Sequence, residues 1–209
     1  MKGDGKNTGV KKHLKVILLG DSGVGKTSII LRYIKDQFSA NSQSTIGANF
    51  VDKELIRDNT TYKLSIWDTT GQEKYRSVTK LFIQGANITI LVYSIDQKSS
   101  LTNLSYWHKT ITDICGDKVV FAIVANKYDL FDNNKGDIVE DEEGEKYASE
   151  INGLFKKVSA KSGRKGVDSL FDMVLDEYIK RSSGENSESE DKNNMKINNT
   201  KKNKKKKGC

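Results

Sequence analysis

Residues 20–28 contain the residue types that bind phosphate groups. The segment reads GDSGVGKTS and fits the pattern G-x-x-x-x-G-K-[ST], with Gly20, Gly25, Lys26 and Thr27 at the fixed positions. Glycines let successive backbone N–H groups point inward, the lysine can reach the β- and γ-phosphates, and the threonine hydroxyl can bind Mg²⁺. An apolar run of strand length precedes the loop, and an apolar helix start follows it. The alternative is a glycine-rich turn that binds nothing, and the later motifs argue against it.

A second motif, at Asp68 to Gln72, follows another apolar run that predicts a strand. A carboxylate at a strand end can support Mg²⁺ directly or through water, so Asp68 is a candidate metal residue. The Gly71 N–H can approach a γ-phosphate, and Gln72 can orient a water for in-line attack. Asp-x-x-Gly alone is common and often only a turn, but a phosphate loop earlier in the chain strengthens the functional interpretation.

Thr45 lies between the first predicted helix and the second predicted strand. Its hydroxyl can reach Mg²⁺ only if the loop that carries it closes over the nucleotide. The alternative is an ordinary polar loop residue.

Two later motifs predict specificity for guanine. Residues 126–129 read NKYD and follow a buried-strand pattern, and residues 159–161 read SAK and follow the last predicted strand. The Asp129 carboxylate can accept two N–H bonds from guanine N1 and N2, which adenine does not offer, and such a site discriminates steeply. The backbone N–H of Ala160 can meet the guanine O6. Either motif alone could be a polar loop, but their order favours GTP binding.

The elements that must position these residues alternate between strand and helix patterns. Residues 49–57 and 61–67 read as a hairpin, and the later alternation implies right-handed parallel crossovers. We expect an α/β phosphate-loop fold: a six-stranded, mostly parallel sheet with one antiparallel edge strand and about five helices on both faces, with ligands beyond the carboxyl ends of the strands. The predicted strands are 14–19, 49–57, 61–67, 88–94, 119–125 and 154–158, and the predicted helices are 25–36, 73–84, 100–114, 141–151 and 167–181.

Length and composition indicate one domain with tails. The chain has 209 residues and 35% apolar content, which is ordinary for a globular protein. We expect a flexible arm over 1–13, the domain over 14–181, and a disordered tail over 182–209, which is too polar to bury a core. No apolar run approaches the roughly 20 residues of a membrane span. The N-terminus lacks the apolar core of a secretory signal.

The excess positive charge belongs to the tail. The formal net charge is +7, and residues 195–209 hold seven lysines and no acid, so the remaining residues balance. A nucleic-acid-binding function would rest only on these lysines, and we expect no nucleic-acid partner. The two cysteines, Cys115 and Cys209, form no disulfide framework, which fits a reducing, cytosolic compartment.

With these motifs in this order, the chain resembles the Ras superfamily of small GTPases and, within it, the Rab family. The resemblance covers roughly residues 14–181 and implies that residues 36–48 and 69–82 are the two switch regions. The Rab-like segments are IGANF at 46–50, KLSIW at 63–67, KYRSVT at 74–79 and LVYSID at 91–96.

The resemblance, together with the motifs, assigns the candidate site residues. Phe38 matches the position that packs on the guanine base. We expect Lys26, Thr45 and Gln72 to act in catalysis, and Thr27, Thr45 and Asp68 to hold Mg²⁺. The expected nucleotide-binding residues are Asp21, Ser22, Gly23, Val24, Gly25, Lys26, Thr27, Ser28, Phe38, Thr45, Gly71, Asn126, Lys127, Asp129, Ser159, Ala160 and Lys161.

The resemblance implies a switch of vesicle traffic that cycles between GTP and GDP with slow, Mg²⁺-dependent hydrolysis. It also implies an exchange factor, a GTPase-activating protein, a GDP-dissociation inhibitor and effectors as partners. Thr70 stands where the family has alanine. The alternative is therefore a GTP-binding module that recruits effectors and hardly hydrolyses. Phe82-Ile83-Gln84 also departs from the usual Tyr-Tyr-Arg.

The end of the chain predicts reversible membrane attachment. Residues 201–207 contain six lysines, and Cys209 is the last residue, where Rab proteins mostly end in two cysteines. A lipid on Cys209 and a basic patch would form a two-signal anchor for an anionic membrane surface. We expect a cytoplasmic protein that attaches to the cytosolic face of an endomembrane.

Overall fold

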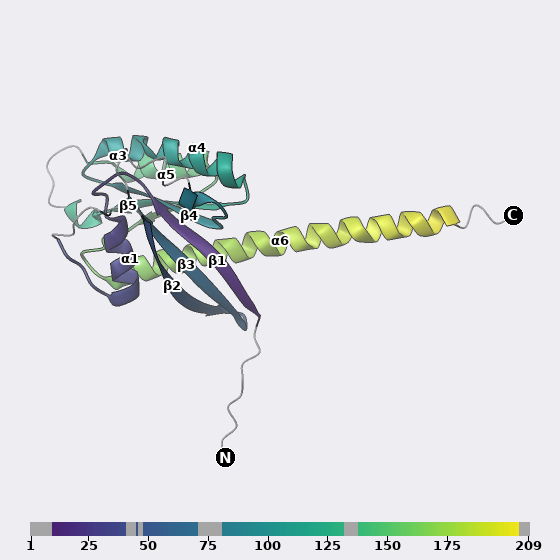
Figure 1. The fold of residues 1–209 in the computed structure, drawn as a ribbon. Coiled ribbons are helices and arrows are strands. Elements are labelled where there is room, and N and C mark those ends of the chain that lie inside the picture. Colours follow the sequence, from purple (N-terminus) through teal and green to yellow (C-terminus); the bar gives the residue numbers. More distant parts are fainter. Residues whose placement is uncertain (1–9, 41–44, 46–47, 71–80, 132–137, 205–209) are drawn as a thin grey trace, which may run out of the picture. The chain divides into compact units, whose positions relative to one another are not determined.

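The computed structural model describes residues 10–40, 45, 48–70, 81–131 and 138–204, and for 185–204 it defines only the helix. Six strands form one sheet in the order β2-β3-β1-β4-β5-β6 (Figure 1). β2 pairs antiparallel with β3, and all other neighbours run parallel, so the predicted fold class is confirmed. The strands are β1 Lys11–Leu19, β2 Ala48–Arg57, β3 Thr60–Thr69, β4 Ile88–Ser94, β5 Val120–Asn126 and β6 Leu154–Lys157; the α-helices are α1 Lys26–Lys35, α3 Lys98–Thr102, α4 Leu104–Cys115, α5 Asp141–Glu150 and α6 Arg164–Lys204, with a short 3₁₀ helix at Tyr128–Leu130.

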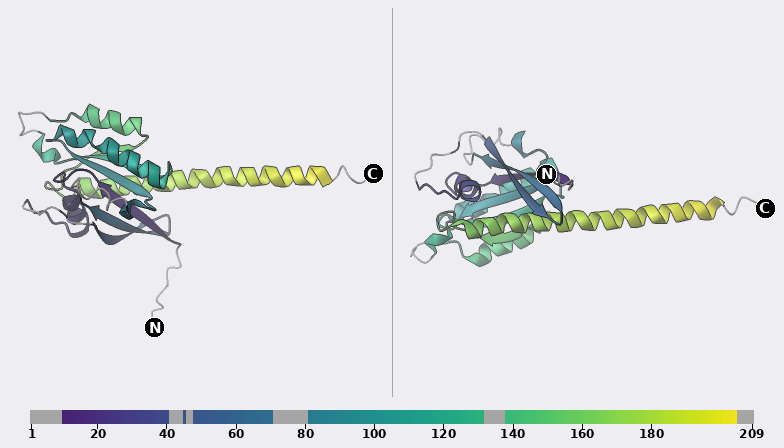
Figure 2. Two further views of the ribbon diagram at one scale, coloured as in Figure 1. Left: turned by 45° about the horizontal axis from the view of Figure 1, so that its top comes forward. Right: turned by 90° about the horizontal axis from the view of Figure 1, so that it is seen from below.

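Apolar side chains pack on both faces of the sheet because successive strand residues point to opposite faces. On one face, Ile17 of β1 and Tyr93 of β4 belong to the same core cluster as Trp107 of α4. On the other, the rings of Tyr33 in α1 and Phe171 in α6 stack with centroids 3.8 Å apart. Figures 1 and 2 show α1 and the start of α6 on one face, and α3, α4 and α5 on the other.

The strand order brings the predicted motifs to one edge of the sheet. Ile17 near the end of β1 pairs with Trp67 of β3, so the phosphate loop that follows β1 begins beside Asp68 near the end of β3. Ser94 of β4 pairs with Asn126 of β5. Because these strands run parallel, their carboxyl ends meet where an open α/β sheet binds ligands.

Several boundaries differ from those predicted. Residues 11–13, assigned to the arm, extend β1 and pair with residues 61–63 of β3. The single helix predicted over 100–114 is two helices separated at Asn103, whose φ of −69° and ψ of −12° lie at the edge of the right-handed helical region. The Asn103 side chain donates to the Asp21 carboxylate at 2.7 Å, a long-range contact that no local pattern could reveal. Most of the predicted helix 73–84 lies outside the described residues.

The last helix is longer than predicted, because α6 continues through Lys204 whereas the predicted helix ended at 181. Helical hydrogen bonds are local, and the chain has no proline to interrupt them. The predicted end at 181 rested only on the scarcity of apolar residues after that position. The chain divides into two compact units, 1–174 and 175–209. Among the described residues, none of the helices combines the length and apolar character needed to cross a membrane.

Candidate nucleotide-binding site

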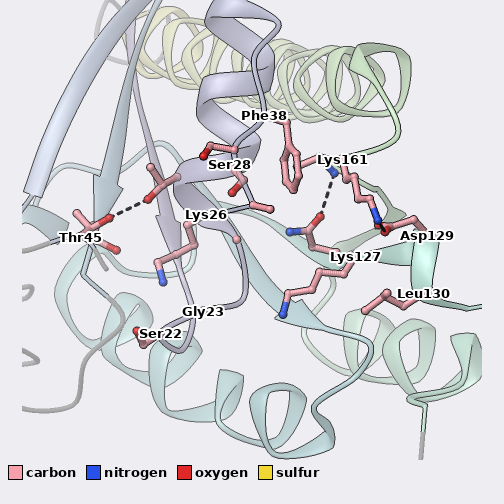
Figure 3. A pocket seen from close by; sticks show the side chains of 17 residues that line it. Ser22, Gly23, Lys26, Ser28, Phe38, Thr45, Lys127, Asp129, Leu130 and Lys161 are labelled. Atoms are coloured by element: carbon pink, nitrogen blue, oxygen red, sulfur yellow. Dashed lines mark hydrogen bonds and ion pairs between the residues drawn. The ribbon is translucent and has the colours of Figure 1, made fainter. Parts of the chain in front are cut away.

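A cavity of about 400 Å³ opens beyond the carboxyl ends of the strands (Figure 3). Figure 3 shows Ser22, Lys26 and Thr45 toward one end, and Phe38 and Asp129 toward the other. The residues predicted to bind phosphate and those predicted to bind the base therefore line the same cavity. The lining residues are Ser22, Gly23, Gly25, Lys26, Thr27, Ser28, Phe38, Ser39, Ala40, Thr45, Thr69, Asn126, Lys127, Asp129, Leu130, Ala160 and Lys161.

Two glycines of the phosphate loop stand where no other residue fits. Gly20 has a φ of +143°, and a Cβ there would lie 2.1 Å from the Val92 carbonyl oxygen. Gly25 has a φ of +96°, and a Cβ there would lie 2.3 Å from the Asn126 side-chain nitrogen. The backbone conformation and the close neighbours both require glycine, so the loop conformation depends on these residue types.

Lys26 is almost fully buried at the first turn of α1. Its Nζ donates to the carbonyl oxygens of Gly20 at 2.7 Å and Asp21 at 2.8 Å. Burial lowers the pKa of Lys26 to about 8, although the nearby carboxylates of Asp68 and Asp21 oppose this shift. A phosphate group in the cavity would favour the charged amine, so the geometry is suited to neutralising phosphate charge.

Three oxygen-bearing side chains converge beside the phosphate loop. The Thr27 hydroxyl donates to Asp68 Oδ2 at 2.7 Å and lies 2.8 Å from the Thr45 hydroxyl. Thr45 lies 3.5 Å from the same carboxylate oxygen. Asp68 Oδ1 is buried without a hydrogen-bond partner among the described residues.

These atoms fit a small hard cation. Mg²⁺ prefers carboxylate, hydroxyl and water oxygens, and the unpaired Asp68 oxygen offers a further acceptor. Burial raises the pKa of Asp68, and a positive charge beside it would oppose that shift. In the described part of the chain, no three His, Cys, Asp or Glu side chains group to hold a metal, so this site would depend on one carboxylate and two hydroxyls.

The other end of the cavity contains the predicted guanine motifs. Asn126 is 2% exposed; its side-chain nitrogen donates to the Val24 carbonyl at 2.7 Å, and its oxygen accepts from the Ala160 N–H at 3.3 Å. Asp129 accepts from the Ser159 hydroxyl at 2.6 Å and pairs with Lys161 at 3.4 Å. The two predicted base loops therefore contact each other and the phosphate loop.

Backbone geometry orients this base end. Lys127 has a φ of +61°, in the left-handed region, and its Nζ lies 3.5 Å from Asp96 Oδ1. The following N–H, of Tyr128, donates to the Val158 carbonyl at 3.1 Å. Phe38 lines the cavity and is 38% exposed, so its ring has a free surface on which a planar base could pack.

The structure brings most of the predicted site residues together, while their ligand roles stay predictions. Asp21, Val24, Ser159 and Asp68 do not line the cavity, although each bonds to the lining or supports it through the contacts above. Gly71 and Gln72 lie outside the described residues, as does Cys209. Four lining residues were not predicted: Ser39, Ala40, Thr69 and Leu130. The available signal was the neighbouring predicted residue for three of them, Phe38 for Ser39, Asp68 for Thr69 and Asp129 for Leu130. For Ala40 it was only the predicted switch region 36–48.

Thr70 is 2% exposed and does not line the cavity, whereas its neighbour Thr69 does. The Thr69 hydroxyl donates to the Leu18 carbonyl at 2.6 Å. The threonine that departs from the family pattern is thus packed in the protein in the described conformation.

Comparison with known proteins agrees with this site. Residues 15–180 match the model of the Ras family. The chain is 43% identical over 161 residues to the GTP-binding protein ypt5 of Schizosaccharomyces pombe, covering 77% of this chain and 75% of ypt5. It is 36% identical over 167 residues to the Ras-related protein Rab-18 of Caenorhabditis elegans, covering 79% of this chain and 80% of that relative.

The fold and the cavity define a phosphate-loop nucleotide-binding protein. The chain belongs to the Ras family, as a small GTPase of the Rab type, and therefore binds guanine nucleotide and has GTPase activity. Its relatives also support a general role in trafficking with regulators and effectors.

Proposed function

We propose that this protein is a Mg²⁺-dependent switch of vesicle traffic that is active with GTP and inactive with GDP. The observation that carries the proposal is that Thr27 and Thr45 line one end of the cavity and Asn126 and Asp129 line the other. Behind the two threonines, the Asp68 carboxylate bonds to their hydroxyl groups. Thr45 belongs to a loop beyond α1, and its contact with Thr27 would be stabilised by a cation and a γ-phosphate. Loss of that phosphate would release the loop, as in other nucleotide switches.

Mg²⁺, when bound, would supply charge neutralisation at the phosphates. Thr27, Thr45 and Asp68 would hold it, and Lys26 would add a second positive charge from the phosphate loop. Phosphoryl transfer in such sites depends mostly on positioning and electrostatics. We assign Gln72 to orient the attacking water, and we expect slow intrinsic hydrolysis that an activating protein accelerates.

Binding without hydrolysis is the competing function, and it rests on Thr70. The buried position of Thr70 off the cavity lining gives that alternative no support. Single-turnover hydrolysis separates the two functions: we expect measurable phosphate release from wild type and little change in Thr70→Ala. A rate at the buffer background in wild type, restored in Thr70→Ala, would establish the alternative.

Reversible attachment to the cytosolic face of an endomembrane completes the proposal. Six lysines in residues 201–207 precede Cys209. Each lysine near an anionic surface contributes about 1 kcal/mol, and one lipid chain alone binds only marginally. We assign the GTPase domain to the predicted range 14–181 together with residues 11–13, which belong to β1, and we assign the basic end of the chain as its anchor. We expect an exchange factor, an activating protein, a GDP-dissociation inhibitor and effectors to act on the domain.

The direct test is nucleotide binding with and without Mg²⁺. We expect GTP and GDP to bind tightly and to displace a fluorescent guanine nucleotide, whereas ATP fails to compete. Removal of Mg²⁺ by EDTA should weaken GTP binding strongly. Equal competition by ATP, or no effect of EDTA, would refute the base and cation assignments respectively.

A further inference from the structure

Arg32 of α1 bonds to two loops that border the base end of the cavity. Its Nε donates to the Ala160 carbonyl at 2.8 Å, and one terminal nitrogen donates to the Lys161 carbonyl at 3.3 Å. Its other terminal nitrogen donates to Asp36, to the carbonyl at 3.0 Å and to the carboxylate at 2.8 Å. The Arg32 side chain is 13% exposed. One guanidinium therefore joins residues 160–161 to the end of α1.

The first set of bonds restrains the loop that offers an N–H to the base. The Ala160 N–H donates to the Asn126 side-chain oxygen at 3.3 Å, and both residues line the cavity. Holding the carbonyls of Ala160 and Lys161 fixes the two peptide planes that follow the Ala160 Cα. The Ala160 N–H belongs to the preceding plane, and its own bond to Asn126 holds it from the other side, so the loop is restrained on both sides of Ala160. Arg32 itself does not line the cavity, so its influence on a ligand must pass through the loop.

The second set of bonds restrains the segment that carries Phe38. Asp36 caps α1 with a φ of +53°, and its N–H donates to the Arg32 carbonyl at 3.1 Å. Phe38 follows two residues later and lines the cavity. A planar guanidinium presents five donors in a fixed fork, which suits bonds in two directions, whereas a lysine offers a single charged point.

We propose that Arg32 is a positioning residue for guanine recognition. It holds the Ala160 N–H toward the guanine O6 and at the same time holds the end of α1 from which Phe38 reaches the base. The inference rests on the proposed contact between Ala160 and O6. It assigns base discrimination to a side chain that touches no part of the nucleotide.

The test compares GDP with the diphosphate of 6-thioguanosine, by competition against a fluorescent guanine nucleotide. This analogue keeps the N1 and N2 N–H groups that Asp129 would bind and replaces O6 by sulfur, a much weaker hydrogen-bond acceptor. We expect Arg32→Met to reduce the preference for GDP by about tenfold, the value of one well-placed hydrogen bond. Arg32→Lys should recover part of this preference. The matched control is Arg164→Met, which removes an arginine whose bond to Asp168 has the same four-residue spacing as Arg32 to Asp36.

Each outcome decides the question. A purely structural role of Arg32 would weaken the binding of both nucleotides equally. An unchanged preference for GDP over the analogue in Arg32→Met therefore overturns the inference. If Arg32→Met fails to fold, Arg32→Lys is measured in its place. A preference for GDP in Arg32→Lys equal to that of wild type would also overturn the inference. A wild-type protein that does not distinguish the two nucleotides would instead remove the proposed O6 contact, and the inference with it.

Discussion

Replacing Gly25 by alanine should destabilise the protein by two separable mechanisms. The φ of +96° places an alanine in strained backbone, which costs about 1–2 kcal/mol. The new Cβ would lie 2.3 Å from the Asn126 nitrogen, which is buried and donates to Val24. Displacing that amide leaves a buried donor unpaired and costs a further 1–3 kcal/mol or so. We therefore expect a total loss of about 2–5 kcal/mol.

Gly23→Ala is the matched control. Gly23 has a φ of +80°, but a Cβ there meets nothing within 4 Å. This variant should lose only the backbone component, about 1–2 kcal/mol. The difference between the two variants then isolates the contact with Asn126.

Urea unfolding monitored by tryptophan fluorescence would provide the measurement. Bound nucleotide adds stability by mass action, so the unfolding free energy must be extrapolated to zero GDP. In an Asn126→Ala background, Gly25→Ala should cost only the backbone component, because its steric partner is gone. Two results would refute the reasoning. One is an equal loss of unfolding free energy in Gly23→Ala and Gly25→Ala, and the other is a loss from Gly25→Ala that is the same in the Asn126→Ala background as in wild type.

Four further predictions concern charge, base, metal and membrane. Burial lowers the pKa of Lys26 to about 8, so the unfolded chain binds this proton more tightly than the folded protein. Between about pH 8 and 10, the unfolding free energy of nucleotide-free wild type should therefore rise relative to that of Lys26→Met by about 1 kcal/mol per pH unit. A difference in urea-unfolding free energy between the two proteins that stays constant with pH would contradict this. Asp129→Asn should shift preference from guanine toward xanthine nucleotides, because the amide presents a donor to the ring; an unchanged preference removes Asp129 from base recognition. Thr27→Asn should weaken GTP binding and reduce its dependence on Mg²⁺, so an EDTA titration that matches wild type would exclude the Thr27 hydroxyl as a ligand. Cys209→Ser should move the protein from membranes to cytosol in fractionated cells, and neutral substitutions at residues 204–207 should make binding weaker and more easily removed by salt; an unmodified Cys209 in protein that is still membrane-bound would disprove the lipid anchor.

The local features of this protein could be predicted from the sequence because short apolar runs and loop residues determine them. The predicted strand 88–94 has the bounds of β4, and the hairpin 49–57 with 61–67 became the antiparallel pair β2 and β3. The phosphate-loop pattern located Lys26 and Thr27 because glycines are needed wherever the backbone must curl around a ligand. The length of α6 was missed, since poor core-forming composition does not by itself end a helix.

Only the tertiary structure decided how distant residues cooperate. No spacing in the sequence indicates that Arg32 bonds to the Ala160 carbonyl, or that Asn103 interrupts a helix while bonding to Asp21. The loop pattern in the sequence indicates that position 25 must be glycine. Only the structure shows why a substitution there should be so destabilising, because a Cβ would lie 2.3 Å from the Asn126 side-chain nitrogen. Such contacts depend on the sheet order and on helix packing across the two faces, which bring residues together across long stretches of chain that local periodicity does not relate.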